Sequence, residues 1–174
     1  MADRASELFD PYELLGALQR QGVSFVVIGA FARVVQGTRE LTDDLDITPS
    51  MRDDNLARLA RALEDLDARR VDGKPIDLHH LTGPVLELET RAGELKLVPE
   101  PAGSRGYEDL RWQASREPLG RGVRPQVASP GDLARMLGAL DRDQDTDKLL
   151  RLRRLITLQR SLGHQHSRSQ GIER

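Results

Sequence analysis

Apolar and polar residues follow recognisable periods along the first third of the chain. Residues 23–28 are nearly all apolar, which is typical of a strand buried on both faces. Gly29 ends this strand, and residues 30–36 are predicted to form a short helix with Gly37 at its C-terminal turn. Residues 41–48 alternate between apolar and polar positions, which predicts a second strand with one buried face.

The other helices are predicted from capping residues and from apolar positions spaced three or four residues apart. Asp10, Ser50 and Ser129 are each placed to cap a helix start, and Glu13 is placed to close a capping box with Asp10. The last helix is predicted to end at Gly163, leaving a polar, disordered tail over residues 164–174. The predicted helices cover residues 10–21, 50–66, 129–140 and 146–162.

Two more strands are predicted at residues 85–90 and 94–98, joined by a hairpin-like connection. Residues 67–81 are mixed in character and are predicted to contain one short strand, and residues 99–106 form a loop. Strands interspersed with helices predict an α+β fold, a small mixed β-sheet flanked by helices with a C-terminal helical extension. We expect a core over residues 1–128 and C-terminal helices packed on it over residues 129–163.

Composition narrows the classes of protein that remain. Aromatic residues make up only 3% of the 174 residues, so the core depends on leucine, valine, isoleucine and alanine. A net charge of −2 argues against nucleic-acid binding over the whole surface, although a local basic face remains compatible with it. Cysteine is absent, which excludes disulfides and cysteine-ligated zinc and fits a cytoplasmic protein. Without an apolar run of about 20 residues or a leader-like N-terminus, we expect no membrane association.

The acidic pair Asp44 and Asp46 is the best candidate for chemistry. Residues two apart on a strand point to the same side, so these two carboxylates project together while Leu45 and Ile47 face the core. Paired carboxylates suit Mg²⁺ or Mn²⁺, which would hold a nucleoside triphosphate there. Gly29 precedes a helix N-terminus, where backbone N–H groups bind phosphate. The alternative is a solvated acidic pair at the end of a strand, which is common on protein surfaces.

These segments together resemble the core of the DNA polymerase β-like nucleotidyltransferase superfamily, and in particular the small bacterial proteins grouped with AbiEii-type and MenT-type toxins. The resemblance covers about three quarters of the chain. It implies that Gly29 and Ala30 bind the nucleotide, that Asp44 and Asp46 bind the metal and catalyse, and that a third carboxylate lies on a later strand. The segments that carry it are residues 25–32, 37–39, 42–47, 55–66, 83–110 and 129–155.

The chain departs from the family pattern at three places. Ala30 replaces a glycine or serine, which keeps the backbone donors. Lys96 stands where the third carboxylate is expected, and a protonated lysine cannot ligate a metal. Either Glu94, on the same strand face, substitutes as a metal ligand, or Lys96 pairs with one of the two aspartates and fills the site without metal. The late helix also lacks the lysine expected near Leu137.

Two functions that use this site therefore remain open, and a third is that of a structural or antitoxin-like partner without a ligand. The first is metal-dependent transfer of a nucleoside monophosphate from a nucleoside triphosphate to RNA, tRNA or a protein, as the toxin of a toxin–antitoxin pair with a cognate antitoxin as partner. The second is a catalytically degenerate protein of this fold that binds nucleotide or another protein. Arg39 and Thr42 precede the acidic pair and are candidate contacts to phosphate or base. The basic last helix is either a solvated face or an RNA-facing surface.

Overall fold

The computed structural model describes residues 9–169, and its side chains as far as Gly163. Seven strands form one mixed sheet in the order β3-β4-β5-β2-β1-β7-β6, which confirms the predicted fold class. The strands are β1 (Phe25–Ile28), β2 (Asp44–Pro49), β3 (Arg69–Arg70), β4 (Leu86–Thr90), β5 (Gly93–Leu97), β6 (Ser115–Arg116) and β7 (Gln126–Val127). The helices are α1 (Pro11–Arg20), α2 (Gly29–Gln36), α3 (Asp53–Asp65), α4 (Tyr107–Leu110), α5 (Pro130–Ala139) and α6 (Thr146–Ser169), with a 3₁₀ turn η2 (Asp143–Asp145) before α6.

The centre of the sheet is formed by β1, β2 and β5. β1 pairs antiparallel with β2, and β2 pairs in parallel with β5, so residues from three distant parts of the chain meet on adjacent strands. All four residues of β1 are buried, as the apolar run predicts. β4 and β5 form the predicted hairpin, and Arg69–Arg70 is the short strand expected in the mixed segment.

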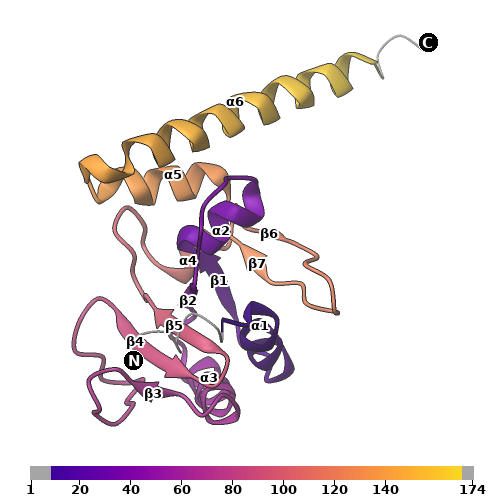
Figure 1. The fold of residues 1–174 in the computed structure, drawn as a ribbon. Helices are drawn as coiled ribbons and strands as arrows, with labels where there is room; N and C mark the ends of the chain where they lie inside the picture. The colour runs from indigo at the N-terminus through magenta and orange to yellow at the C-terminus, as the bar shows by residue number, and fades with distance from the viewer. Residues whose placement is uncertain (1–8, 170–174) are drawn as a thin grey trace.

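Helices cover the sheet from two ends of the molecule. In Figure 1, α1 and α3 lie at the bottom, whereas α2, α5 and α6 are stacked above the strands. The core between them is built from leucine, valine and isoleucine, with Leu14, Leu45, Leu59 and Leu95 completely buried. Within residues 9–169, no helix combines the length and apolar character that crossing a bilayer requires.

Helix starts confirm part of the capping prediction. Asp10 and Ser129 accept hydrogen bonds from the backbone N–H groups of Glu13 and Asp132, each 3.1 Å long. The reciprocal half of the capping box is absent, because the N–H of Asp10 donates to the carbonyl of Ala92 instead. The carboxylate of Glu13 is held by arginine side chains.

Ser50 does not cap the third helix, which corrects the prediction. The helix begins at Asp53 with Arg52 at its N-cap, and no side chain bonds to its free N–H groups. The side chain of Asn55 instead bonds the backbone of Ser24 and Ser50, tying the start of α3 to the residue before β1 and the residue after β2. Two aspartates in the first turn of α3 complement the helix dipole.

The last helix is longer than predicted. α6 continues through Gly163 to Ser169, so the predicted end at Gly163 is wrong and residues 164–169 are helical rather than disordered. The backbone at Gly163 is not in the left-handed conformation that a glycine cap requires, and a glycine within a helix costs only about 1 kcal/mol. Residues 170–174 of the predicted tail, and residues 1–8 of the segment analysed for a leader, lie outside the described residues.

Candidate functional site

The acidic pair lies at the start of β2, beside the centre of the sheet. Leu45 and Ile47 are completely buried in the core, as the alternation predicts, and the carboxylates of Asp44 and Asp46 share the opposite face. Asp43, which precedes the pair, is exposed to solvent. β5 runs parallel to β2 with Glu94 opposite Asp44 and Lys96 opposite Asp46, so all four charged side chains lie on one face of the sheet.

Gly29 is packed directly against the second aspartate. Antiparallel pairing places Ile28 opposite Asp46, and the next residue, Gly29, begins α2 with a φ of +70°. A Cβ at Gly29 would collide with the carboxylate of Asp46, and its backbone conformation is one that only glycine adopts readily. No side chain caps the N-terminus of α2, so its first N–H groups are open to an anion in the same place.

Asp46 is the electrostatically perturbed group of the site. Burial, followed by repulsion from the charge of Asp44, raises the pKa of Asp46 from its usual value near 3.8 to about 6, while Lys96 and Arg33 act against the shift. Its Oδ1 atom is buried without a hydrogen-bond partner. A buried, unpartnered carboxylate oxygen is costly for the fold, and a bound cation would remove the cost.

Lys96 holds the position that the resemblance assigns to a third carboxylate. Its ammonium Nζ lies 2.7 Å from Oδ2 of Asp44 and 3.4 Å from Oε1 of Glu94. Burial favours the neutral amine, but the hydrogen bond to Asp44 and the surrounding negative charges outweigh it and raise the pKa of Lys96 above its usual value. Lys96 is therefore protonated at every physiological pH, and its ammonium contacts the carboxylates of Asp44 on β2 and Glu94 on β5.

A cleft of about 630 Å³ joins these groups. One wall contains Gly29, Ala30, Asp44, Asp46 and Lys96. The facing wall is apolar and comes from α5 and the residue that follows it. The apolar wall residues are Leu133, Met136, Leu137 and Leu140, and α5 carries no lysine here.

The two residues predicted as additional nucleotide contacts lie outside this lining. The hydroxyl of Thr42 donates to the carbonyl of Asp44 over 3.0 Å, so Thr42 supports the start of β2. The side chain of Arg39 is exposed, and its carbonyl accepts a hydrogen bond from Arg151 of α6. Glu94 contacts the cleft only through Lys96.

A buried ion pair that the sequence analysis did not identify fixes the loop before β2. The guanidinium of Arg33 donates two hydrogen bonds of 2.8 and 3.0 Å to the carboxylate of Glu40, and the hydroxyl of Thr38 donates a third of 2.8 Å. Both charged side chains are only 9% exposed. Burial raises the pKa of Glu40, but these hydrogen bonds outweigh it and keep the pKa below its usual value. The apolar neighbours of Arg33 in α2 were the only sequence sign that it turns inward.

The carboxylate oxygens of the cleft are suited to bind one divalent ion but not two. The unpartnered oxygen of Asp46, the neighbouring carboxylate of Asp44 and the cradle at Gly29 suit a single hard cation. A second ion would have to take the place of the Lys96 ammonium on Asp44. Among the side chains that the structure describes, no group of three histidine or acidic residues is arranged to hold a metal.

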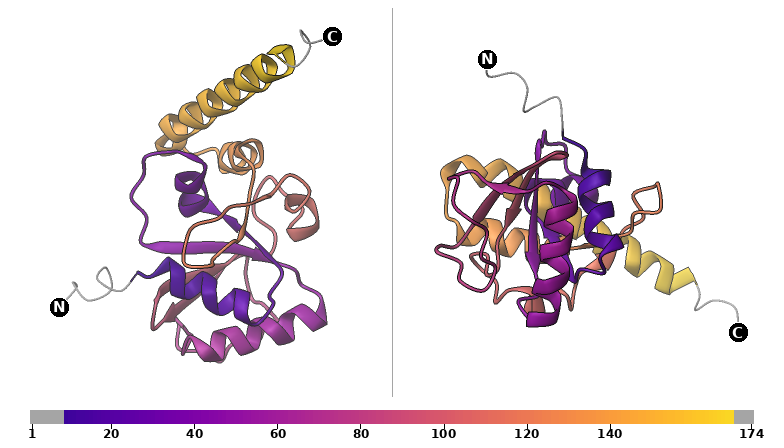
Figure 2. Two further views of the ribbon diagram at one scale, coloured as in Figure 1. Left: turned by 90° about the vertical axis from the view of Figure 1, so that its right-hand side faces the viewer. Right: turned by 90° about the horizontal axis from the view of Figure 1, so that it is seen from below.

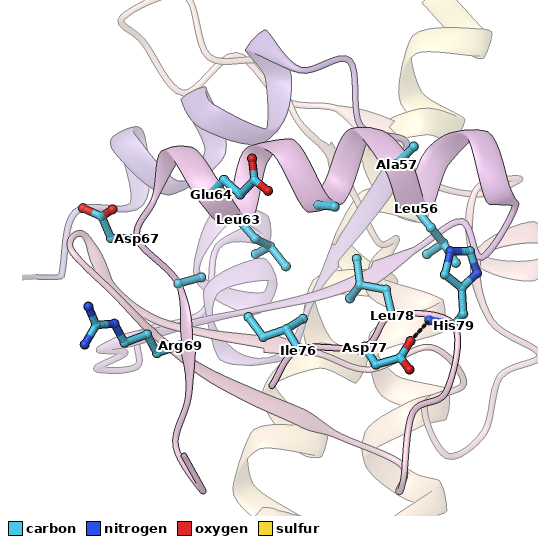
Figure 3. A pocket seen from close by; sticks show the side chains of 12 residues that line it. Leu56, Ala57, Leu63, Glu64, Asp67, Arg69, Ile76, Asp77, Leu78 and His79 are labelled. Carbon is cyan, nitrogen blue, oxygen red and sulfur yellow. Dashed lines mark hydrogen bonds between the residues drawn. The ribbon is translucent and has the colours of Figure 1, made fainter. Parts of the chain in front are cut away.

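A second concavity, of about 550 Å³, lies away from this site. Figure 3 shows it between α3 and residues 67–79, with Leu56, Leu63 and Leu78 inside and Glu64, Asp67 and Asp77 around its edge. His79 is near it, and its ring Nδ1 lies 3.7 Å from Asp53. Because this concavity contains none of the residues of the acidic pair, it is a separate feature of the surface.

Comparison with known proteins gives structural neighbours only. No family model matches the chain, and no curated protein sequence matches it. The lincomycin-bound structure of the lincosamide antibiotic adenylyltransferase LnuA superposes with a TM-score of 0.58 at 15% identity, covering 84% of this chain and 98% of that one. ANT(2'')-Ia in complex with adenylyl-2''-tobramycin gives 0.52 at 18% identity, with 89% and 88% covered.

A solution structure of the antibiotic-resistance factor ANT(2'')-Ia gives a TM-score of 0.51 at 15% identity and covers 92% of both chains. At these identities the comparisons define the fold and nothing finer. The chain therefore has the fold of these structures, one of which is an adenylyltransferase, and its place in the polymerase β-like superfamily stays a prediction. The finer assignment to AbiEii-type or MenT-type proteins stays a prediction.

Proposed function

We propose that this chain is a nucleotide-binding protein built on the nucleotidyltransferase fold, in which Lys96 has replaced the third carboxylate and nucleotidyl transfer is lost. The contact of 2.7 Å between the Lys96 ammonium and Asp44 is the single observation that carries the proposal. In the active members implied by the resemblance, that position supplies negative charge to a metal. In this chain the same position carries the positive charge of Lys96, which would repel a metal ion rather than bind it.

The remaining residues provide the means to bind a triphosphate. The open N–H groups at Gly29 and Ala30 would donate to phosphate oxygens, and the absent Cβ of Gly29 lets them approach. Asp46, with Asp44 beside it, would hold one Mg²⁺ or Mn²⁺, which would neutralise phosphate charge when bound. The apolar wall of Met136 and Leu140 would cover a base or sugar face. Lys96 is protonated, so it cannot act as the base that would activate an acceptor hydroxyl.

A second candidate function is metal-dependent transfer of a nucleoside monophosphate to RNA, tRNA or a protein, with the chain acting as a toxin opposite an antitoxin. It is favoured by the buried Oδ1 of Asp46, which is held without a partner at an energetic cost. Such an atom is a strained group of the kind that active sites retain for function. For this function, Lys96 would have to leave Asp44 when substrate binds.

Two measurements on the same variants test these functions, and nucleotide binding is the first. Binding of ATP, GTP, CTP and UTP is measured by calorimetry with Mg²⁺, with Mn²⁺ and with chelator, for the wild type, Asp46→Asn and the matched control Asp43→Asn. We expect binding that needs the divalent ion, survives in Asp43→Asn and is lost in Asp46→Asn. No nucleotide binding by the wild type under any condition refutes the proposed function.

The same samples are incubated with α-³²P-labelled triphosphates, total RNA and cell extract. We expect no labelled product from the wild type. Label transfer that disappears in Asp46→Asn establishes the second candidate instead. In that case Lys96→Asp should increase the transfer, since it restores a third carboxylate.

A further inference from the structure

The second half of α6 extends beyond the rest of the molecule. Figures 1 and 2 show α6 continuing past the end of α5 as a projecting helix, and we call residues 157–169 the overhang. The first half is anchored by Leu152, which is completely buried. From Thr157 to Gly163 every side chain is exposed, with Leu158 at 58% and Leu162 at 62%.

The overhang carries an apolar ridge that nothing covers within the described chain. Leu158 and Leu162 are four residues apart and share a face of the helix, and that face continues from the half-buried Leu155. The overhang continues the 24-residue helix α6, and most of the stability of a helix in a protein comes from packing of its apolar face. The ridge therefore indicates a docking face rather than a purely solvated helix.

The charge of α6 selects the kind of surface that can cover it. From Lys148 to Gly163 the helix contains five basic residues and no acidic one. These are Lys148, Arg151, Arg153, Arg154 and Arg160. Arg160 lies in the overhang and Arg153 and Arg154 lie just before it, so an apolar surface with an acidic edge would be complementary to this part of α6. Two adjacent exposed leucines also favour a protein groove over RNA, whose phosphates offer them no apolar contact.

Such a groove is present on the same chain. The concavity in Figure 3, which we call the α3 groove, has an apolar floor of Leu56, Leu63 and Leu78. Ala57 and Ala60 are small and exposed on α3, so a second helix can approach closely. The edge carries the acidic side chains Glu64, Asp67 and Asp77, with Arg69 as its one arginine.

The dimensions of the two features also match. α3 has 13 residues and is about 20 Å long at 1.5 Å per residue, and the overhang from residue 157 to residue 169 has the same length. Helix α3, which lines the groove, and the overhang lie at opposite ends of the molecule in Figures 1 and 2, so the overhang cannot reach the groove of its own chain. A second copy supplies both surfaces at once.

We propose that the chain forms a twofold dimer in which the overhang of each copy lies in the α3 groove of the other. Leu158 and Leu162 fill the apolar floor, and the arginines of α6 face the acidic edge. The contact is reciprocal, so each dimer contains it twice and the assembly closes. This inference does not depend on what the cleft binds.

The test uses the full chain and light scattering after size exclusion over a range of concentrations. The wild type is expected to have a mass of twice 19.4 kDa at high concentration. Leu158→Asp/Leu162→Asp removes the ridge, and Ala60→Arg places bulk and positive charge in the groove. Both variants are expected to stay monomeric. The matched control Leu150→Asp changes an exposed leucine of α6 that lies outside the overhang, and it should dimerise as the wild type does.

Mixing the two monomeric variants gives the decisive result. One retains an intact groove and the other an intact overhang, so a mixed dimer with one of the two contacts should form. Circular dichroism of each variant alone establishes that it is folded. A wild type that is monomeric at every concentration overturns the proposal, as does dimerisation that both variants leave unchanged. Two monomeric variants that fail to associate when mixed would show that the overhang and the groove do not contact each other, and would overturn it too.

Discussion

Replacing Asp46 by asparagine should stabilise the protein, and the gain should depend on pH. The pKa of Asp46 is raised from about 3.8 to about 6, so the folded state holds this proton more tightly than the unfolded chain does. At about 1.4 kcal/mol per pH unit, ionising Asp46 in the folded state costs about 3 kcal/mol. Asparagine keeps the shape of the side chain and removes the charge.

The sign follows from linkage between protonation and folding. The stability contributed by protonated Asp46 is fully present below about pH 3.8 and is lost as the pH rises through about 6. The free energy of unfolding of Asp46→Asn should therefore match that of the wild type near pH 4. It should exceed the wild-type value by up to about 3 kcal/mol near pH 7.

The assay is urea unfolding of both proteins at a series of pH values, followed by circular dichroism. Asp43→Asn is the control, because it removes a neighbouring carboxylate that is exposed, and its difference from the wild type should be small at every pH. A difference between Asp46→Asn and the wild type that stays constant with pH, or shrinks as the pH rises, refutes the account of Asp46 as a buried charge held at a cost.

Three further substitutions test other parts of the site. Gly29→Ala should lower the thermal midpoint by the equivalent of about 2 kcal/mol, because its Cβ would collide with the carboxylate of Asp46 and its φ is strained for alanine. The control Gly138→Ala, inside α5, should be neutral or stabilising. Arg33→Met should cost about 3 kcal/mol in urea unfolding, because buried Glu40 would keep only Thr38 and the more distant Lys148 as partners. Arg33→Met/Glu40→Leu should recover much of this loss, and equal losses in the two variants would contradict the account. Leu152→Ala should cost about 3 kcal/mol and loosen α6, which faster amide exchange along that helix would show.

The part of the site that is built from residues close together in the chain could be predicted from the sequence. The buried run of β1, the break at Gly29 and the alternation around Leu45 are each visible within a few residues, and the structure contains all three where they are predicted. The pairing of Lys96 with Asp44 was one of two alternatives from sequence. Parallel pairing of β2 with β5 decides it, and that pairing joins segments about 50 residues apart.

Other features were beyond the reach of local patterns. β6 and β7 have two residues each, too few for any period, and are strands only because β1 lies beside β7. The burial of Arg33 depends on Glu40 and Thr38 arriving from the following loop. Gly163 suggested a helix end, but a glycine stops a helix only when the chain beyond it adopts a left-handed turn.

The order in which the cleft assembles follows from the sheet register. Gly29 and Asp46 belong to one short β1-α2-β2 unit, whereas Lys96 arrives on β5 from much later in the chain. Contacts between distant segments form more slowly than local ones. During refolding, the carboxylates of Asp44 and Asp46 should thus lie side by side before Lys96 joins them. Cations in the buffer should therefore change the rate at which β5 is added to the sheet more than they change the final stability.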